Sequence, residues 1–302
     1  MIFRHLSYLL LMVFLSASAG QAAYFTDGRD REAIPELRER VAGDPSGASD
    51  LDRAILRAAN RVGWVQWNKC RHGGNGVLVR IDGRDAVLTS AHQVFNARGR
   101  GDLINCQGQG AAVARFYPNA SYIDLGQTFR NRALEARFSV GLRAQLDASG
   151  ANKSGFFGVA DDFLVMYLET DISDDTAPDG QIRGAVPFAD LVTGHGFDGL
   201  ILGFDPRFDK AHGGQAMSYQ SCLFSVLTPL RLDHTCDVTK GSSSSLLAVF
   251  QEGELRLRAL NTAVRLPVGT TARPDALPTN WNIGTPIEVM LRHWHFRGLT
   301  VD

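Results

Sequence analysis

Short apolar runs separated by turn residues dominate the chain, and few stretches place apolar residues at helical spacing. Residues 76–81 and 86–89 are two such runs, and they flank Asp82-Gly83, a dipeptide typical of two-residue hairpin turns. A similar hairpin is expected at residues 246–250 and 255–260. The remaining apolar runs of strand length are residues 64–67, 163–168 and 200–204. Many short strands joined by turns of this kind predict an all-β barrel or sandwich.

One segment near the amino terminus has a helical pattern with a start signal. Ser49, followed three residues later by Asp52, resembles a capping box. Leu51, Ile55 and Val62 then belong to an apolar series at helical spacing, which predicts a short helix over residues 50–61. Residues 24–48, which are rich in Asp, Arg, Gly and Pro, are expected to wrap the surface.

Residues 1–22 have the pattern of a secretory signal. Arg4 and His5 form a short basic start, residues 9–15 are apolar, and small residues follow up to a cleavage site after Ala22 or Ala23. The apolar run is too short to span a bilayer, and no later stretch approaches the required length of about 18 apolar residues. We therefore expect a soluble mature protein that is secreted or periplasmic and does not span the membrane.

Composition and charge narrow the range of partners. The chain has 302 residues, of which 44% are hydrophobic and 21% are charged, which is enough for one or two buried cores. The formal net charge is −1 and the arginines are scattered, whereas a nucleic-acid surface normally shows a basic excess. We expect no nucleic-acid partner, no cofactor and no metal site.

Three segments carry residues suited to nucleophilic chemistry. His92 follows a predicted strand, Asp162 precedes another, and Ser243 stands in a run of four serines before a hairpin. A serine hydroxyl becomes a good nucleophile when a base removes its proton, and an imidazole can do so near neutral pH. A buried carboxylate would hold that imidazole in the correct tautomer, and Asp161 competes with Asp162 for this role. The alternative for the serine run alone is a flexible loop.

In their order and local sequence, these segments resemble the trypsin/chymotrypsin-like serine peptidases. Thr89-Ser90-Ala91-His92 is similar to the family's T-[AS]-A-H motif, residues 162–168 to its Asp-apolar motif, and residues 241–245 to its G-x-S-G-[GS] motif. The resemblance covers about residues 60–265. It implies a double β-barrel, a His92-Asp162-Ser243 triad, peptide or protein substrates, and an oxyanion hole built from the backbone N–H groups of Gly241 and Ser243.

The local patterns and the resemblance together give the expected division of the chain. A signal peptide at 1–22 is followed by an N-terminal extension with a short helix at 23–61. The first barrel, with the His and Asp, spans 62–175, and the second barrel, with the Ser, spans 176–270. A C-terminal extension occupies 271–302.

Several positions depart from the family pattern. Ser244 replaces the usual Gly, Leu246 replaces a Pro, and Ser242 stands where trypsin-like zymogens have an Asp. These departures resemble a bacterial, exported branch of the family, such as the exported trypsin-like and glutamyl endopeptidase-like enzymes. Ser244 leaves open a second hypothesis, in which the chain is a catalytically inactive homologue that acts as a binding module.

The four cysteines allow three pairings. An exported protein favours two disulfides over a zinc site, which would normally show close Cys-x2-Cys pairs. We expect Cys70–Cys106 beside the histidine hairpin and Cys222–Cys236 beside the segment that leads to Ser243.

The resemblance also suggests residues for substrate selection. Asp237 lies six residues before Ser243, where an Asp selects Arg or Lys in trypsin-like enzymes. Asn261 stands where glutamyl endopeptidase-like sequences are expected to carry a histidine, and that difference weakens a preference for acidic residues. We therefore expect cleavage after basic residues.

An α/β-hydrolase is a further alternative, because its triad runs in the order Ser, Asp, His. Ser243, Asp275 and either His293 or His295 fit that order. However, the nucleophile of that fold lies between a buried strand and a helix, whereas residues 231–240 are polar and residues 246–250 have a strand pattern. The sequence favours the peptidase-like interpretation.

Overall fold

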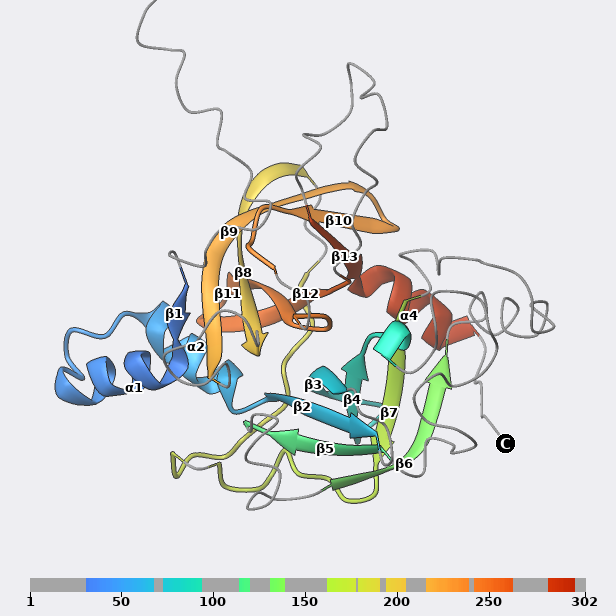
Figure 1. The fold of residues 1–302 in the computed structure, drawn as a ribbon, viewed down its shortest axis with the longest axis horizontal. Helices are drawn as coiled ribbons and strands as arrows, with labels where there is room; N and C mark the ends of the chain where they lie inside the picture. The colour runs from blue at the N-terminus through green and yellow to red at the C-terminus, as the bar shows by residue number, and fades with distance from the viewer. Residues whose placement is uncertain are drawn as a thin grey trace, which may run out of the picture.

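Two antiparallel β units form the molecule (Figure 1). The computed structural model describes residues 31–67, 73–93, 114–119, 131–138, 162–177, 179–190, 194–204, 216–238, 242–262 and 282–296. The first unit is a closed barrel with the strand order β2-β3-β4-β7-β6-β5. Its strands are β2 Val62–Trp67, β3 Gly73–Ile81, β4 Arg84–Thr89, β5 Ala114–Pro118, β6 Asn131–Phe138 and β7 Leu164–Leu168.

The second unit is a seven-stranded sheet with the order β1-β9-β10-β13-β12-β11-β8, in which β8 also pairs with β9 so that the sheet curls back on itself. Its strands are β1 Glu32–Ala33, β8 Gly194–Phe204, β9 Met217–Thr228, β10 Arg231–His234, β11 Leu246–Gln251, β12 Glu254–Asn261 and β13 Asn282–Pro286. The expected all-β, double-barrel fold is confirmed.

Tight turns place the strands that flank the site. Asp82 and Gly83 have φ values of 52° and 77°, the left-handed conformation that a two-residue hairpin turn requires, and β3 pairs with β4 directly across them. Glu252 and Gly253 repeat this conformation, with φ values of 52° and 79°, between β11 and β12. Both hairpins expected from the sequence are confirmed.

Two helices precede the first barrel. Helix α2 (Asp50–Ala59) begins at Ser49 with the predicted capping box, in which Ser49 and Asp52 bond to each other's backbone N–H. The expectation that residues 24–48 only wrap the surface is wrong for residues 34–43, which form helix α1 (Ile34–Gly43). Ile34 and Leu37 recur at helical spacing and are buried, and this apolar face stabilises the helix despite its polar composition.

The sheet of the second unit extends beyond residue 270, where the second barrel was expected to end. β13 lies between β10 and β12 and pairs with both, and helix α4 (Ile287–Phe296) follows it directly. β9 and β10 were also not predicted. Their buried faces include polar residues such as Ser218, Ser225 and Asp233, so the apolar alternation of a half-buried strand is interrupted.

A continuous hydrophobic core connects the two units. It contains first-barrel residues such as Val77 and Leu88, second-unit residues such as Leu202 and Leu257, and Ile55 of α2. Burial across both units holds the edges that carry the candidate site in a fixed relation. In the ranges that the structure describes, no helix is both long and apolar enough to cross a membrane.

Candidate active site

The first barrel supplies two of the three candidate residues. His92 lies in a short 3-10 helix, η1 (Ala91–Gln93), directly after β4, and Asp162 lies just before β7. β4 and β7 are antiparallel, with Thr89 opposite Leu164, so the end of one strand coincides with the start of the other. Strand pairing therefore brings His92 and Asp162 together although they are distant in sequence.

Hydrogen bonds join the three side chains in one line. The backbone N–H of His92 donates to Oδ1 of Asp162 at 2.9 Å, and Nδ1 of His92 lies 2.7 Å from Oδ2 of the same carboxylate. Nε2 of His92 lies 2.9 Å from Oγ of Ser243, which comes from the loop before β11 in the second unit. A proton on Nδ1, directed at the carboxylate, leaves Nε2 free to accept the hydroxyl proton. Asp161, the competing carboxylate, lies outside the described residues.

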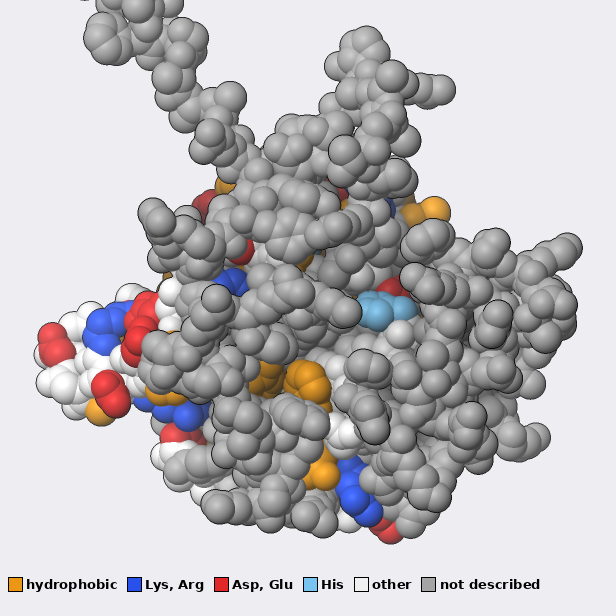
Figure 2. Space-filling view, in the orientation of Figure 1, with side chains coloured by type: hydrophobic (Ala, Val, Ile, Leu, Met, Phe, Trp, Pro, Cys, Tyr) orange, Lys and Arg blue, Asp and Glu red, His pale blue; other side chains and the backbone are white. Residues whose placement is uncertain are grey.

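The environment of His92 favours its charged form. Asp162 is almost fully buried, whereas the imidazole side chain retains 27% of its exposure, and Figure 2 shows histidine surface in pale blue over η1. Burial is the largest influence on the imidazole and opposes protonation, but the charge of Asp162 and its hydrogen bond together outweigh it. The pKa of His92 is therefore raised above its ordinary value of 6.5.

The peptide before Ser243 is held firmly on one side. The carbonyl oxygen of Ser242 accepts from Nδ2 of Asn261 at 2.8 Å, from Oγ of Ser245 at 2.8 Å and from the N–H of Ser245 at 3.1 Å. In a trans peptide the N–H points away from the carbonyl, so the N–H of Ser243 faces away from Asn261. A fixed N–H beside a nucleophile can stabilise an oxyanion. Gly241, the other expected donor, lies outside the described residues.

Asn261 is fully buried behind this loop. Besides Ser242, its amide contacts His234, whose Nε2 lies 3.2 Å from Oδ1 of Asn261. Asn261 was expected to contact substrate. In the structure its side-chain amide contacts the serine loop and a buried histidine.

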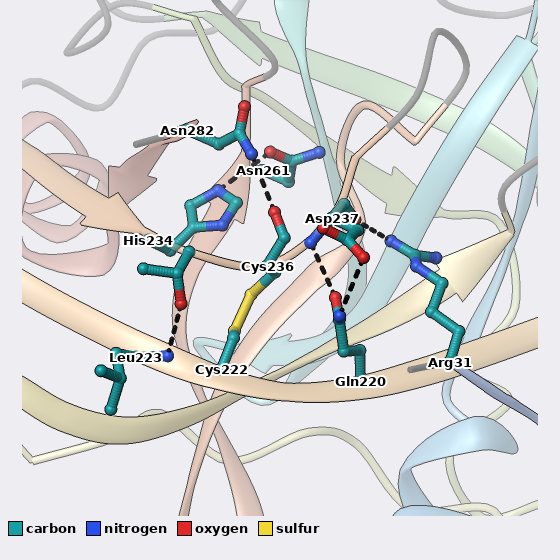
Figure 3. The surroundings of a disulfide bond; sticks show 10 residues. Arg31, Gln220, Cys222, Leu223, His234, Cys236, Asp237, Asn261 and Asn282 are labelled. Atoms are coloured by element: carbon teal, nitrogen blue, oxygen red, sulfur yellow. Dashed lines mark hydrogen bonds between the residues drawn. A yellow bond between two sulfur atoms is a disulfide. The ribbon is translucent and has the colours of Figure 1, made fainter. Parts of the chain in front are cut away.

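Asp237, the other residue expected to contact substrate, is also buried (Figure 3). Gln220 binds it twice: Nε2 donates to the carboxylate at 3.0 Å, and Oε1 accepts from the backbone N–H at 2.7 Å. The guanidinium of Arg31, from the N-terminal extension, donates to the carbonyl of Asp237 and to Oγ of Ser218, the latter at 3.0 Å. A cation of the same chain thus lies beside Asp237.

Cys222 and Cys236 form a disulfide next to Asp237, as predicted (Figure 3). The bond connects β9 to the segment that leads towards Ser243. Asn282 at the start of β13 supports the same segment by donating to the carbonyl of Cys236 at 2.8 Å. The predicted Cys70–Cys106 bond lies outside the described residues.

The sequence provided no signal for several residues around the site. His234 is fully buried against the ring of Phe224, at a centroid distance of 6.3 Å. Burial is the main cause that lowers the pKa of His234 to about 3, with the charge of Arg31 acting in the same direction. Gln93 and Arg31 were likewise not predicted, because their contacts join residues far apart in the chain. Among the described residues, no cluster of His, Cys, Asp and Glu could hold a metal ion.

The closed six-stranded barrel and the curled seven-stranded sheet have the arrangement of the chymotrypsin-like fold. Two solved structures similar to this chain share it. A Glu endopeptidase in complex with MPD is 14% identical with a TM-score of 0.51, covering 78% of this chain and 90% of that chain. A thermostable serine protease, AL20, from an extremophilic microorganism is 16% identical with a TM-score of 0.50, covering 80% and 97%.

These similarities establish the fold. No family model and no curated protein matches the sequence. Any assignment of activity therefore depends on the geometry of the site.

Proposed function

We propose that the protein is an exported serine endopeptidase that hydrolyses peptide bonds through Ser243, His92 and Asp162. The observation that carries this proposal is the line of hydrogen bonds from the Asp162 carboxylate through both imidazole nitrogens to Oγ of Ser243. Such a line supplies a nucleophile, a general base and a group that orients the base, as acyl transfer requires.

The proposed reaction proceeds through a covalent acyl-enzyme. Nε2 of His92 takes the proton of Ser243 as Oγ attacks the peptide carbonyl, and the imidazolium then gives that proton to the leaving amine. Asp162 stabilises the imidazolium. The N–H groups of Ser243 and Gly241 would bind the oxyanion. Water, activated by the same imidazole, then releases the acid product and restores the serine.

The disulfide supports the proposed location. Disulfides persist in oxidising compartments, and Cys222–Cys236 agrees with export under a signal at residues 1–22. We place the protein in the periplasm or outside the cell, with a peptide or protein as substrate. One of the similar structures is named a Glu endopeptidase, so this fold also occurs in an enzyme whose name refers to glutamate.

Cleavage after basic residues stays a prediction. Asp237 supplies the carboxylate that such a preference needs, but Arg31 lies next to it and Gln220 binds it. If Asp237 selects basic residues, the substrate has to compete with these internal partners. Profiling the wild type and Arg31→Gln with a mixed peptide library tests this, since cleavage mainly after Glu or large apolar residues would contradict it.

The fold affects the two alternative functions, an α/β-hydrolase and an inactive homologue, differently. An α/β-hydrolase is excluded by the fold, because that class needs a parallel sheet covered by helices and both sheets here are antiparallel. The inactive homologue is the second hypothesis, and it was motivated by the replacement of the family's usual Gly by Ser244. Ser244 adopts the left-handed backbone that glycine would supply, with φ of 64°.

Labelling with a fluorophosphonate probe tests the proposal. We expect the wild type to be labelled and to hydrolyse casein, and Ser243→Ala to lose both properties while remaining folded. Ser242→Ala removes a hydroxyl from the neighbouring residue and should keep its labelling. A folded wild type that is neither labelled nor active would favour the binding module.

A further inference from the structure

The hydroxyl of Ser244 lies between the serine loop and the turn that carries His92. Its oxygen accepts from the backbone N–H of Ser90 at 2.6 Å and from Nε2 of Gln93 at 2.7 Å, and the hydroxyl donates to Oγ of Ser90 at 2.7 Å. Ser90 and Gln93 stand on either side of His92 in the sequence, and Ser244 directly follows Ser243. One hydroxyl thus connects the neighbours of the two proposed catalytic side chains.

These bonds use the full capacity of a hydroxyl, which has one donor and two acceptor sites. Thr89 lies 3.3 Å away, but its own proton has a shorter partner in the carbonyl of Asn75, at 2.8 Å. Ser244 and Ser90 are fully buried and Gln93 nearly so. Loss of the hydroxyl would leave several buried polar groups without this partner.

We propose that Ser244 is a positioning residue whose side chain fixes the distance between Ser243 Oγ and His92 Nε2. This inference rests on the proposed peptidase function and goes beyond it. The residue at this place needs a left-handed backbone, which glycine adopts without strain. Ser244 has a φ of 64°, a conformation that is less favourable for serine than for glycine, but its side chain provides a link that a glycine lacks.

Other contacts hold the serine loop to the first barrel through the carbonyl of Ser243. The amide of Asn75 donates to the carbonyl of Ser243 at 3.2 Å and to the carbonyl of Phe204 at 3.0 Å. These bonds hold the serine loop and the end of β8 against the first barrel. From the His92 turn, Nε2 of Gln93 also donates to the carbonyl of Ser243, but at 3.4 Å this bond is longer than its 2.7 Å bond to Oγ of Ser244. Ser244 bonds directly to that turn, and so its loss should misalign the reacting pair without removing the loop from the barrel.

Ser244→Gly tests this inference, because glycine keeps the backbone conformation and removes only the hydroxyl link. We expect kcat to fall by about 10- to 100-fold, the scale of a small misplacement of reacting groups. KM should change by less than about twofold, since Ser244 is buried and contributes no ground-state binding. Gln93→Ala should lower kcat as well, and its effect should add only in part to that of Ser244→Gly, because the two variants share one bond and each also removes others.

Ser173→Ala is the matched control. It removes another buried hydroxyl, which donates to Asp85 at 2.9 Å near the start of β4, the opposite end from His92. We expect it to lower stability and to leave kcat unchanged. An unchanged or increased kcat in Ser244→Gly, or fully additive effects with Gln93→Ala, would overturn the proposal.

A crystal structure of Ser244→Gly separates this inference from the proposed function. The distance between Ser243 Oγ and His92 Nε2 is 2.9 Å and should increase beyond about 3.5 Å, the limit of a hydrogen bond. That distance can be measured even if the wild type proves inactive. A distance that stays below this limit would contradict the positioning role whether or not the protein is a peptidase.

Discussion

His92 and His234 are two imidazoles in similar surroundings with different partners. Each ring is largely removed from water, and each has one nitrogen bonded to a side chain with two polar atoms, Asp162 in the first case and Asn261 in the second. The pKa of His234 is lowered to about 3, and that of His92 is raised. Burial lowers both pKa values, so the carboxylate alone reverses the outcome for His92.

The comparison shows which histidine can act as a base near neutral pH. A neutral ring with a pKa of about 3 binds a proton too weakly to take one from a hydroxyl, whereas a pKa above 6.5 matches that task. Although burial is the largest single influence on both rings, the partner decides whether the pKa ends above or below 6.5. His234 instead supports Asn261, which holds the carbonyl of Ser242.

Replacing Asp162 should have the largest effect. Asp162→Asn gives His92 the kind of partner that His234 has, so we expect kcat to fall by about 10³- to 10⁴-fold, as for related triads. The pKa of His92 should also fall, because desolvation remains and the opposing charge is gone. The pH profile of kcat/KM measures this: the rise with pH should be centred above 6.5 in the wild type and at lower pH in the variant.

Asp190→Asn is the control for this experiment, since it changes the net charge equally at an exposed position. Its profile should match that of the wild type. A midpoint that stays in place or moves to higher pH in Asp162→Asn would contradict the explanation.

The free energy of unfolding at acid pH should depend on the protonation of His234. Between pH 6.5 and about 3 the unfolded chain binds a proton at this residue and the folded chain does not, so the free energy of unfolding decreases as the pH falls. The slope from this residue should approach about 1.4 kcal/mol per pH unit. His92 acts in the opposite sense: its raised pKa adds stability below 6.5, and this is lost as pH rises through the folded value.

Urea unfolding at several pH values measures this slope. His234→Phe should flatten the acid limb, because it removes the titrating group while keeping an aromatic ring beside Phe224. His195→Gln changes an exposed histidine and should leave the limb as it is. Equal slopes in the wild type and His234→Phe would show that another group causes the acid sensitivity.

The disulfide next to His234 should have an effect of similar or smaller size. Its cysteines are separated by 14 positions, and closing a loop of that length contributes roughly 3 kcal/mol by the chain-entropy estimate. The double variant Cys222→Ser/Cys236→Ser should lose about this free energy of unfolding, measured by urea at neutral pH. Adding reductant to the wild type should reproduce the loss, and no difference between the oxidised and reduced proteins would contradict it.

The smallest effect should come from Arg31. Its charge contributes to the low pKa of His234 after burial, so Arg31→Met should raise that pKa by less than about one unit. The NMR shift of the His234 ring, followed as a function of pH, measures this change. Arg38→Met removes a cation that instead contacts Asn60 and Asn119 and should leave the titration unchanged. A pKa that falls in Arg31→Met would rule out an electrostatic role for that residue.

The sequence allowed the local parts of this structure to be predicted. The Asp82-Gly83 turn and the Ser49 cap act within a few residues, so their signals are visible without a fold. The residues of the candidate triad were found because their motifs are short and ordered, although their meeting depends on strand pairing. Helix α1 was missed because its apolar face is narrow and its composition is polar.

The contacts that support the site could not be predicted from local patterns. Ser244 and Ser90 lie 154 positions apart, and their bond exists only because the two units pack together. The pair of His234 and Asn261 spans 27 positions and depends on β10 and β12 lying on either side of β13. Hydrophobic periodicity describes which face of a strand is buried, but it does not say which strand lies beside it.

The place of β13 has a consequence for the order of folding. β10 and β12 are not paired with each other in the finished sheet, because a strand made later than either one lies between them. Until residues 282–286 arrive, both strands have an unpaired edge, and the carbonyl of Cys236 lacks the amide of Asn282. The segment between the disulfide and Ser243 therefore gains this support only after residues 282–286 have joined the sheet.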